Sequence, residues 1–406
     1  MRTRAITILG LLLAATGATT WAADRPAAGP SGFLYGTIET DSRQTHTGLL
    51  RWNTEESFWD DLFNSTKDEV PHLEAHERSG QRRREVRVFG FSFGYKWDDS
   101  RQFVARFGDI QTIEPLRGEK VRLTMKDGTK ITVDGGSNDI GAKVSVRDDA
   151  LGEVRIDWDR IERITFRATP ASERPGVLRL YGVLTTRHGS FEGYVQWDSE
   201  ECRSTDKLDG DSADGDVSIE MGKIRTIERR GRSGSRVVLE DGREFELHGS
   251  NDVDDSIRGI LVEDPRYGRV KVSWDEFVRL ELRSVDHSGR GYAAFPAGRP
   301  LRGTVTDASG RAVSGRIVFD LDEEWTWEML DGQADGVEYI IPFALVRSIE
   351  PQRGDRSKIV LRAGGEIVLE DSHDVSEDNS GVLILGAGDR ETFVEWDDVK
   401  RIDFDP

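Results

Sequence analysis

The sequence predicts an all-β protein of three tandem repeats, because several landmarks return at intervals of roughly 120 residues. The clearest landmark is a short polar loop motif with a Trp-Asp pair downstream of it. Its copies are Ser137-Asn138-Asp139 with Trp158, Ser250-Asn251-Asp252 with Trp274, and Ser372-His373-Asp374 with Trp396. These landmarks place the repeats at residues 32–168, with an insertion at about 60–100, at 177–284 and at 300–406.

A finer period predicts that each repeat contains two half-units. A large apolar residue is followed by an aliphatic or aromatic residue at +3 and by an aliphatic residue at +6. This spacing suits a strand that breaks into one tight helical turn and then resumes as a closing strand. The six occurrences are Phe107-Ile110-Ile113, Trp158-Ile161-Ile164, Met221-Ile224-Ile227, Trp274-Phe277-Leu280, Phe343-Val346-Ile349 and Trp396-Val399-Ile402.

Local alternation of apolar and polar residues predicts strands rather than helices. Residues 154–158 and 270–274 alternate in this way, which is typical of a strand with one buried face. Asp-Gly dipeptides at 127–128 and 241–242 lie between such segments and indicate hairpins, because the turn requires positive φ. One short helix is expected, around residues 68–78.

Together, a strand, an Asp-Gly hairpin, an alternating strand, a one-turn helix and a short final strand resemble the small SH3-like or Sm-like β-barrel. The resemblance covers most of residues 32–404 and implies six small barrel half-units. Sm-like proteins often bind RNA, but fold does not carry function with it. A net charge of −19 also argues against a nucleic-acid partner, because an acidic surface repels phosphate.

The N-terminus predicts export. Arg2 and Arg4 precede an apolar run from Ala5 to Ala18, and small residues follow at a cleavage point after Ala22, as in a secretory signal peptide. We therefore expect residues 1–22 to be removed and the protein to be periplasmic or secreted. No later stretch is apolar enough to span a membrane. A single cysteine, Cys202, excludes an intrachain disulfide.

No arrangement of residues predicts a catalytic site. His72 and His76 are spaced to share a helix face, but no third metal ligand is evident. Ser372-His373-Asp374 contains the residue types of a catalytic triad, but consecutive residues cannot adopt the triad geometry. The basic run at residues 82–84 is expected to be a solvated loop. We therefore expect a protein that is not an enzyme.

Two binding hypotheses remain open. Oxygen ligands cluster around Asp139, Asp252 and Asp374, which favours either calcium or turns stabilised by Asn and Asp side chains. Trp59, Trp325 and Trp327 lie beside carboxylates, which is typical of sugar-stacking or protein-binding surfaces as well as of ordinary core packing. The sugar hypothesis requires Trp59 and Trp325 to be exposed.

The expected function is that of an exported binding or scaffolding module of the cell envelope. Its partner would be an envelope protein or a glycan, with no nucleic acid and no cofactor other than calcium. The alternative is a carbohydrate-binding or calcium-dependent carbohydrate-active protein.

Overall fold

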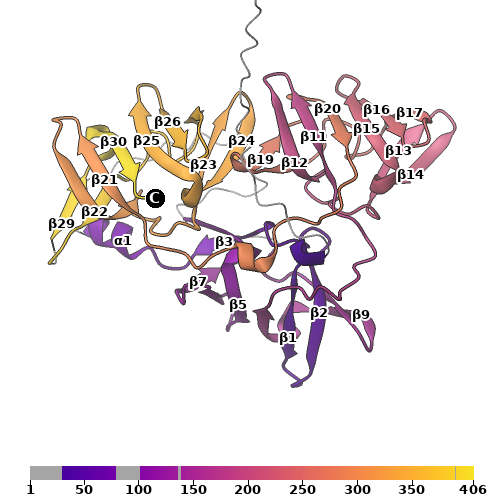
Figure 1. The fold of residues 1–406 in the computed structure, drawn as a ribbon, viewed down its shortest axis with the longest axis horizontal. Coiled ribbons are helices and arrows are strands. Elements are labelled where there is room, and N and C mark those ends of the chain that lie inside the picture. The colour runs from indigo at the N-terminus through magenta and orange to yellow at the C-terminus, as the bar shows by residue number, and fades with distance from the viewer. Residues whose placement is uncertain (1–29, 79–100, 136–138, 389) are drawn as a thin grey trace, which may run out of the picture.

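The computed structural model describes residues 30–78, 101–135, 139–388 and 390–406 of the chain. Within these residues the protein is all-β, as predicted, with thirty strands, one α-helix and two large antiparallel sheets (Figure 1). The expected signal peptide at residues 1–22 and the basic run at 82–84 lie outside the described residues. No helix in the described part of the chain is long and apolar enough to cross a membrane.

The first ten strands form one sheet, the first strand set, in the order β4-β3-β7-β6-β5-β10-β1-β2-β8-β9. The short helix α1 (Pro71–Arg78) follows β3, where a helix was expected. The strands are β1 (Tyr35–Thr40), β2 (Thr45–Trp52), β3 (Leu62–Lys67), β4 (Gln102–Arg106), β5 (Ile110–Pro115), β6 (Val121–Met125), β7 (Lys130–Asp134), β8 (Val144–Asp148), β9 (Gly152–Ile156) and β10 (Ile161–Phe166).

The next ten strands, the second strand set, pair in the corresponding order β14-β13-β17-β16-β15-β20-β11-β12-β18-β19. The acidic stretch at 209–216 belongs to the β13–β14 hairpin. The strands are β11 (Tyr181–Thr186), β12 (Ser190–Gln196), β13 (Lys207–Ser212), β14 (Gly215–Glu220), β15 (Ile224–Arg229), β16 (Gly234–Leu239), β17 (Glu244–His248), β18 (Ile260–Asp264), β19 (Gly268–Val272) and β20 (Phe277–Leu282).

The last ten strands, the third strand set, follow the same order again, β24-β23-β27-β26-β25-β30-β21-β22-β28-β29. Pairing of β19 with β24 joins the second and third sets into one sheet. The strands are β21 (Arg302–Asp307), β22 (Ala312–Phe319), β23 (Met329–Ala334), β24 (Val337–Pro342), β25 (Val346–Gln352), β26 (Arg356–Leu361), β27 (Glu366–Glu370), β28 (Val382–Leu385), β29 (Glu391–Val394) and β30 (Val399–Phe404).

Each of these orders is open, since no pairing among the described residues closes a set into a barrel. The expected closed barrels are therefore not confirmed, whereas a repeat-like sheet architecture is present. Positions in different sets are called equivalent below where they hold the same place in this recurring order.

A one-turn 3-10 helix explains the +3/+6 apolar spacing. Phe107 begins such a turn, its carbonyl accepts the N–H of Ile110, and β5 then begins at Ile110. Residues three apart in a 3-10 turn lie on the same side, so the spacing directs Phe107, Ile110 and Ile113 into the core, where all three are fully buried. Five of the six occurrences begin with a 3-10 helix, and the one at Trp274 begins with a hydrogen-bonded turn.

One fully buried aromatic residue lies at the end of the second strand of each set or directly after it: Trp52, Trp197 and Phe319. Trp52 packs edge-on against Phe63, with ring centroids 5.8 Å apart, and Trp197 packs edge-on against Phe277 at 5.3 Å. The first set has its own core, while the second and third sets share a continuous one. These rings therefore anchor the point where each strand turns into its polar loop.

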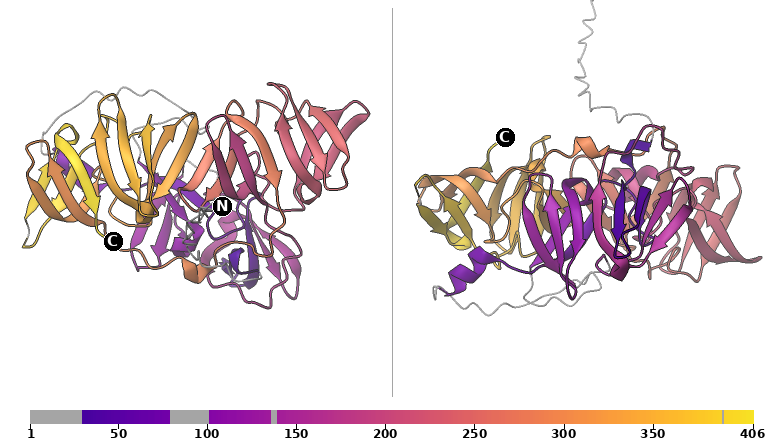
Figure 2. Two further views of the ribbon diagram at one scale, coloured as in Figure 1. Left: turned by 45° about the horizontal axis from the view of Figure 1, so that its top comes forward. Right: turned by 90° about the horizontal axis from the view of Figure 1, so that it is seen from below.

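The first strand set lies against both of the others, below their junction in Figure 1 and in front of it in the right-hand view of Figure 2, where the molecule is seen from below. The segment at residues 286–300 runs back over it, and the ring of Tyr292 lies 4.5 Å from that of Trp59. Phe295 is packed so closely on Gly108 that an added Cβ would meet its ring at 2.4 Å. The segment that joins the second strand set to the third thus forms part of the packed structure.

Replacing Trp197 by Ala should lower the free energy of unfolding by about 3–5 kcal/mol, because it empties a fully buried ring site. Urea unfolding followed by circular dichroism measures this change. Leu178→Ala is the matched control, since Leu178 is 57% exposed and its truncation should change stability by less than about 0.5 kcal/mol. Equal effects of the two substitutions would contradict the packing described.

Candidate functional site

The loop after the second strand of each set has the same unusual backbone. Its first residue is Asn53, Asp198 or Asp320, with φ of 51°, 48° and 49° respectively. Asn and Asp tolerate this left-handed conformation better than other side chains. The backbone N–H of the preceding aromatic residue then bonds to the carbonyl of a glutamate four residues on, at Glu56, Glu201 or Glu323. This short closed loop fixes where the glutamate side chain lies.

The Asp of the recurring polar loop motif has a structural partner in every set. Each of these carboxylates accepts a backbone N–H from the third strand of its own set. The distances are 2.6 Å for Asp139, 2.7 Å for Asp252 and 2.9 Å for Asp374. Trp52 and Trp197 each donate their indole N–H to the motif's carbonyl, at 2.9 Å in both cases. The turn-stabilising role considered for these residues is therefore present, and it uses one carboxylate oxygen of each.

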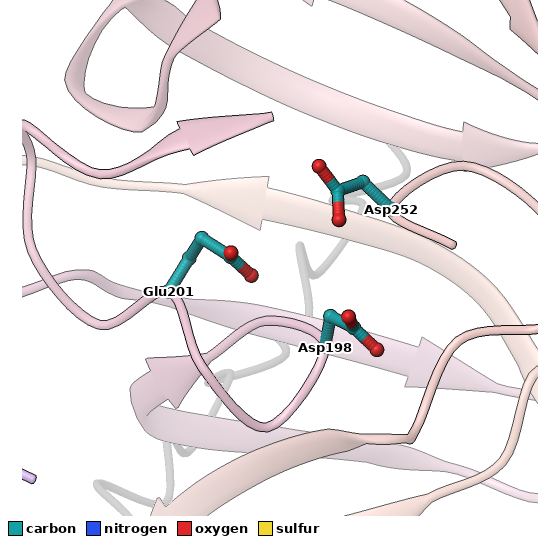
Figure 3. Close-up of side chains that lie close together, drawn as sticks. All are labelled: Asp198, Glu201 and Asp252. Carbon is teal, nitrogen blue, oxygen red and sulfur yellow. The ribbon is translucent and has the colours of Figure 1, made fainter. Parts of the chain in front are cut away.

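The fold brings the two loops together into carboxylate clusters. Asp198, Glu201 and Asp252 place one oxygen each within 4.8 Å of one another, and Figure 3 shows Asp198 and Glu201 on one loop and Asp252 on another beside it. Asp320, Glu323 and Asp374 do the same in the third set, where all three residues are buried. Sequence reasoning named the two loops separately. Their shared period was the one signal that could have joined them.

Burial and neighbouring negative charges hold several of these carboxyls in their protonated form. Desolvation, followed by the charge of Asp252, raises the pKa of Glu201 to about 9. Desolvation likewise raises the pKa of Asp252 to about 6 and that of Asp139 to about 7. The pKa values of Glu323 and Asp374 are raised well above the ordinary range for the same reason.

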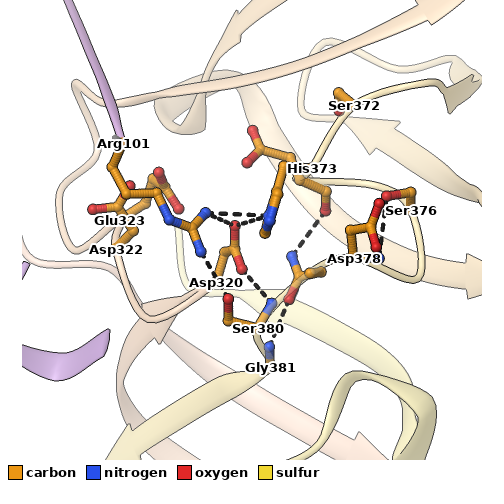
Figure 4. A network of polar contacts seen from close by, with 12 residues as sticks. Arg101, Asp320, Asp322, Glu323, Ser372, His373, Ser376, Asp378, Ser380 and Gly381 are labelled. Carbon is orange, nitrogen blue, oxygen red and sulfur yellow. Dashed lines mark hydrogen bonds and ion pairs between the residues drawn. The ribbon is translucent and has the colours of Figure 1, made fainter. Parts of the chain in front are cut away.

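One carboxylate in each of the two clusters bonds to an arginine. Asp320 bonds to Arg101, to the ring of His373 at 2.8 Å and to the N–H of Ser380 (Figure 4). Although burial opposes ionisation, these partners lower the pKa of Asp320. In the second set, Asp198 accepts hydrogen bonds from Arg258 and Asn251.

The same network removes the triad alternative for Ser372-His373-Asp374. His373 bonds through Nδ1 to Asp320, while the hydroxyl of Ser372 donates to the carbonyl of Asp331 at 2.7 Å. Ser372 is thus held by a backbone acceptor, and Figure 4 shows that the ring of His373 is directed to Asp320. The three residues form a structural loop, as the sequence analysis expected.

The tryptophans considered for sugar stacking are mostly inside the protein. Trp59 is fully buried between Tyr292 and Phe166, and Trp327 is 2% exposed with its indole N–H on Asp127 at 3.0 Å. Trp325 is half-buried, with the guanidinium of Arg316 over its ring. The sugar hypothesis required Trp59 to be exposed. This prediction is wrong, because the segment at 286–300 covers Trp59.

The two histidines on α1 do not converge on a shared ligand. His72 lies 3.4 Å from the carboxylate of Glu324, whereas the ring of His76 stacks on Phe393 of β29 at 4.4 Å. Helix α1 therefore docks the first set onto the third. Cys202 is 1% exposed, and burial raises the pKa of its thiol to about 12.

The junction of β19 with β24 is a second feature that could bind other molecules. Tyr339 of β24 pairs opposite Val270 and places its ring 6.1 Å from Phe191 and 5.3 Å from Tyr267. The turn before β24 lies against Glu276, so an added Cβ on Gly336 would meet that side chain at 2.8 Å. An edge strand and its aromatic side chain thus fill a groove beside β19.

The equivalent place beside β29, at the outer edge of the third set, is an open groove of about 270 Å³. We call it the β29 groove. Thr392 takes the place of Val270, Val313 that of Phe191 and Asp398 that of Glu276. Its lining is Val305, Asp307, Ala308, Ser309, Arg311, Val313, Thr392, Phe393, Val394, Glu395 and Asp398.

Comparison with known proteins gives no relative for this architecture: no family model, no curated protein and no solved structure matches the chain.

In a buffer with a metal chelator, the protein should lose stability as the pH rises from about 4 to about 9. The folded state holds the protons of Glu201 and Asp252 more tightly than the unfolded chain does, so their contribution is fully present at low pH and is lost as the pH rises through the raised pKa values. Urea midpoints near pH 6 and pH 9 measure the loss.

Glu201→Gln should reduce this difference, because glutamine cannot ionise. Glu240→Gln, at an exposed position, is the control and should leave the difference unchanged. A pH dependence that is identical in the wild type and in Glu201→Gln would show that the Glu201 carboxyl is not protonated in the fold.

Proposed function

We propose that this protein is an exported, non-enzymatic β-repeat module that binds a partner protein by accepting an extended strand at the edge of its sheet. The observation that carries the proposal is the β19–β24 junction, where an edge strand already docks by pairing and by one buried aromatic side chain. Strand addition of this kind takes affinity from main-chain hydrogen bonds and specificity from side-chain pockets.

The recurring strand order supports three tandem repeats of two half-units each. In the first set, β10-β1-β2-β8-β9 is one run of five strands, and β5-β6-β7-β3-β4 is another with the corresponding order. In each run a 3-10 helix comes directly before the strand that stands first in that order, β10 or β5. The strands β3 to β7 lie in the chain between β2 and β8, so one half-unit is inserted into the other.

The β29 groove is the docking position that this proposal favours. At the internal junction, the equivalent groove holds Tyr339 and the turn at Gly336, so a partner strand with a large aromatic residue fits the same place. Val313 replaces the larger Phe191, which leaves room for such a side chain. The partner is therefore an extended segment of another protein that carries a tyrosine or a residue of similar size.

A peptide with the chain's own β24 sequence, residues 336–343, should bind the full-length protein at the β29 groove. Fluorescence anisotropy of the labelled peptide measures the affinity. Replacing Tyr339 by Ala in the peptide should cost about 2 kcal/mol, or roughly thirtyfold in Kd, because the aromatic anchor is lost.

Val313→Trp in the protein should abolish peptide binding, since the indole fills the groove. Val368→Trp is the matched control, at an exposed position on β27 outside the groove, and should bind the peptide normally. The proposal fails if the wild type does not bind the peptide, or if Val313→Trp, with an unchanged melting temperature, binds it as tightly as the control does.

Export to the periplasm or the medium is the second part of the proposal, supported by the signal-like N-terminal sequence. Mass spectrometry of the protein recovered from its native compartment should find a mature chain that begins at Ala23. A chain recovered only from the cytoplasm, with residues 1–22 intact, would contradict it.

A further inference from the structure

Each of the two carboxylate clusters has the oxygen spacing of a divalent-cation site. Three oxygens from Asp320, Glu323 and Asp374 lie within 4.8 Å of one another, as do those from Asp198, Glu201 and Asp252. Oxygens bound to one Ca²⁺ at about 2.3–2.6 Å can lie no farther apart than roughly 5 Å. The clusters also contain only oxygen ligands, which suit a hard cation.

A second observation points to a ligand in the same place. Oε2 of Glu323 has no hydrogen-bond partner and is buried, in a residue that is only 8% exposed. Burying a carboxylate oxygen without a partner costs free energy, so such atoms call for a bound group. The equivalent Oε2 atoms of Glu56 and Glu201 are also buried without a hydrogen-bond partner. The same orphaned oxygen therefore occurs at one position in all three strand sets.

The carboxyl groups in and around the third-set cluster outnumber the basic side chains that neutralise them. Asp322, Glu328 and Asp331 lie close to the three cluster residues, which gives six carboxyl groups in one buried region. Lys67 and Arg101 neutralise part of this charge: Lys67 contacts Asp322 and Glu328 at 2.9 Å, and Arg101 contacts Asp320. Six carboxyl groups therefore face two fixed cations, and a divalent cation that displaces their protons can be neutralised there.

We propose that each cluster binds one divalent cation of the calcium type, with Glu323 and Asp374, and equivalently Glu201 and Asp252, as the principal ligands. Asp320 and Asp198 face the same position but are already bonded to arginines, so they act mainly as further negative charges. The cation joins the loop after the second strand to the polar loop motif, which are otherwise separate segments of each set.

The first strand set provides an internal contrast. Asn53 stands where the other sets have Asp198 and Asp320, so this position has one carboxylate fewer beside Glu56 and Asp139. Cation affinity at calcium sites rises with the number of charged ligands. We therefore expect two cations for each chain rather than three.

The test is a calcium titration of the full-length protein after chelator treatment, followed by isothermal titration calorimetry and thermal melting. The wild type should take up two Ca²⁺ ions, and its melting temperature should rise with the Ca²⁺ concentration, as for any ligand that binds only the folded state. Glu323→Gln should lose one equivalent, and the double variant with Glu201→Gln should lose both.

Asp371→Asn is the control, because Asp371 is an exposed carboxylate close to the third-set cluster and outside it. It should bind two ions as the wild type does. A structural role alone gives a different result: the double variant would then change the melting temperature without changing the response to Ca²⁺.

Glutamine is neutral without taking up a proton, whereas Glu201 and Glu323 must be protonated to be buried, so the metal-free double variant should melt above the metal-free wild type at neutral pH. A raised melting temperature would show that the variant still folds. The proposal is overturned if the wild type binds no Ca²⁺ at millimolar concentrations, which is the weak end of the range for extracellular calcium sites. It is also overturned if the double variant binds as many ions as the wild type. Both outcomes are independent of whether the β29 groove binds a peptide.

Discussion

An open sheet has two edge strands, and their unpaired N–H and C=O groups favour pairing with other chains. Every strand set of this protein meets that constraint, because its ten strands pair in an open order that ends at the fourth and ninth strands. Two of these edge strands, β19 and β24, pair with each other within the chain. Within the described residues, β4, β9, β14 and β29 each have a partner on one side only. The arrangement of the three sets follows from how these edges are covered or left open.

Buried ion pairs hold the first strand set in its place against the other two. Arg179 and Arg269 of the second set contact Asp60 and Asp61 of the first, and all four side chains are buried. Such pairs contribute little net stability, because desolvation offsets most of the attraction. A displaced interface, however, would leave these charges buried and unpaired. The pairs therefore act mainly by specifying one relative position of the strand sets, because displaced positions have a higher free energy.

Much of the fold could be predicted from local sequence, because the local pattern repeats. The +3/+6 spacing marked the 3-10 turns and the strands after them, and it marked residues such as Phe107, Ile110 and Ile113 as core. What could not be predicted is how segments meet at long range. The acidic neighbours of Trp59 fitted either a surface or a core position, and it is Tyr292, more than two hundred positions further along the chain, that covers the ring. Local patterns also could not show that Glu201 and Asp252 converge, since the loops that bear them are joined only by the folded sheet.

The β19–β24 junction and the outer edge at β29 have different side chains. The difference determines which strand the outer edge can accept. At the internal junction, Phe191 and Tyr267 enclose Tyr339, and Lys271 of β19 pairs opposite Glu338 of β24. At the outer edge, Val313 and Thr392 line a groove that remains open. A second copy of this chain would offer β14 as the equivalent strand.

In β14, Val217 stands where β24 has Tyr339. Valine is too small to fill the groove that the missing aromatic rings leave, and poorly filled apolar space forfeits the contacts that stabilise a docked strand. Asp216 would also stand in the place of Glu338, and it would face Phe393 where Glu338 faces Lys271. Head-to-tail assembly of identical chains would thus lose both the aromatic contact and the charge pair of the internal junction. The side chains therefore favour a different protein, with a larger residue at this position, as the occupant of the β29 groove.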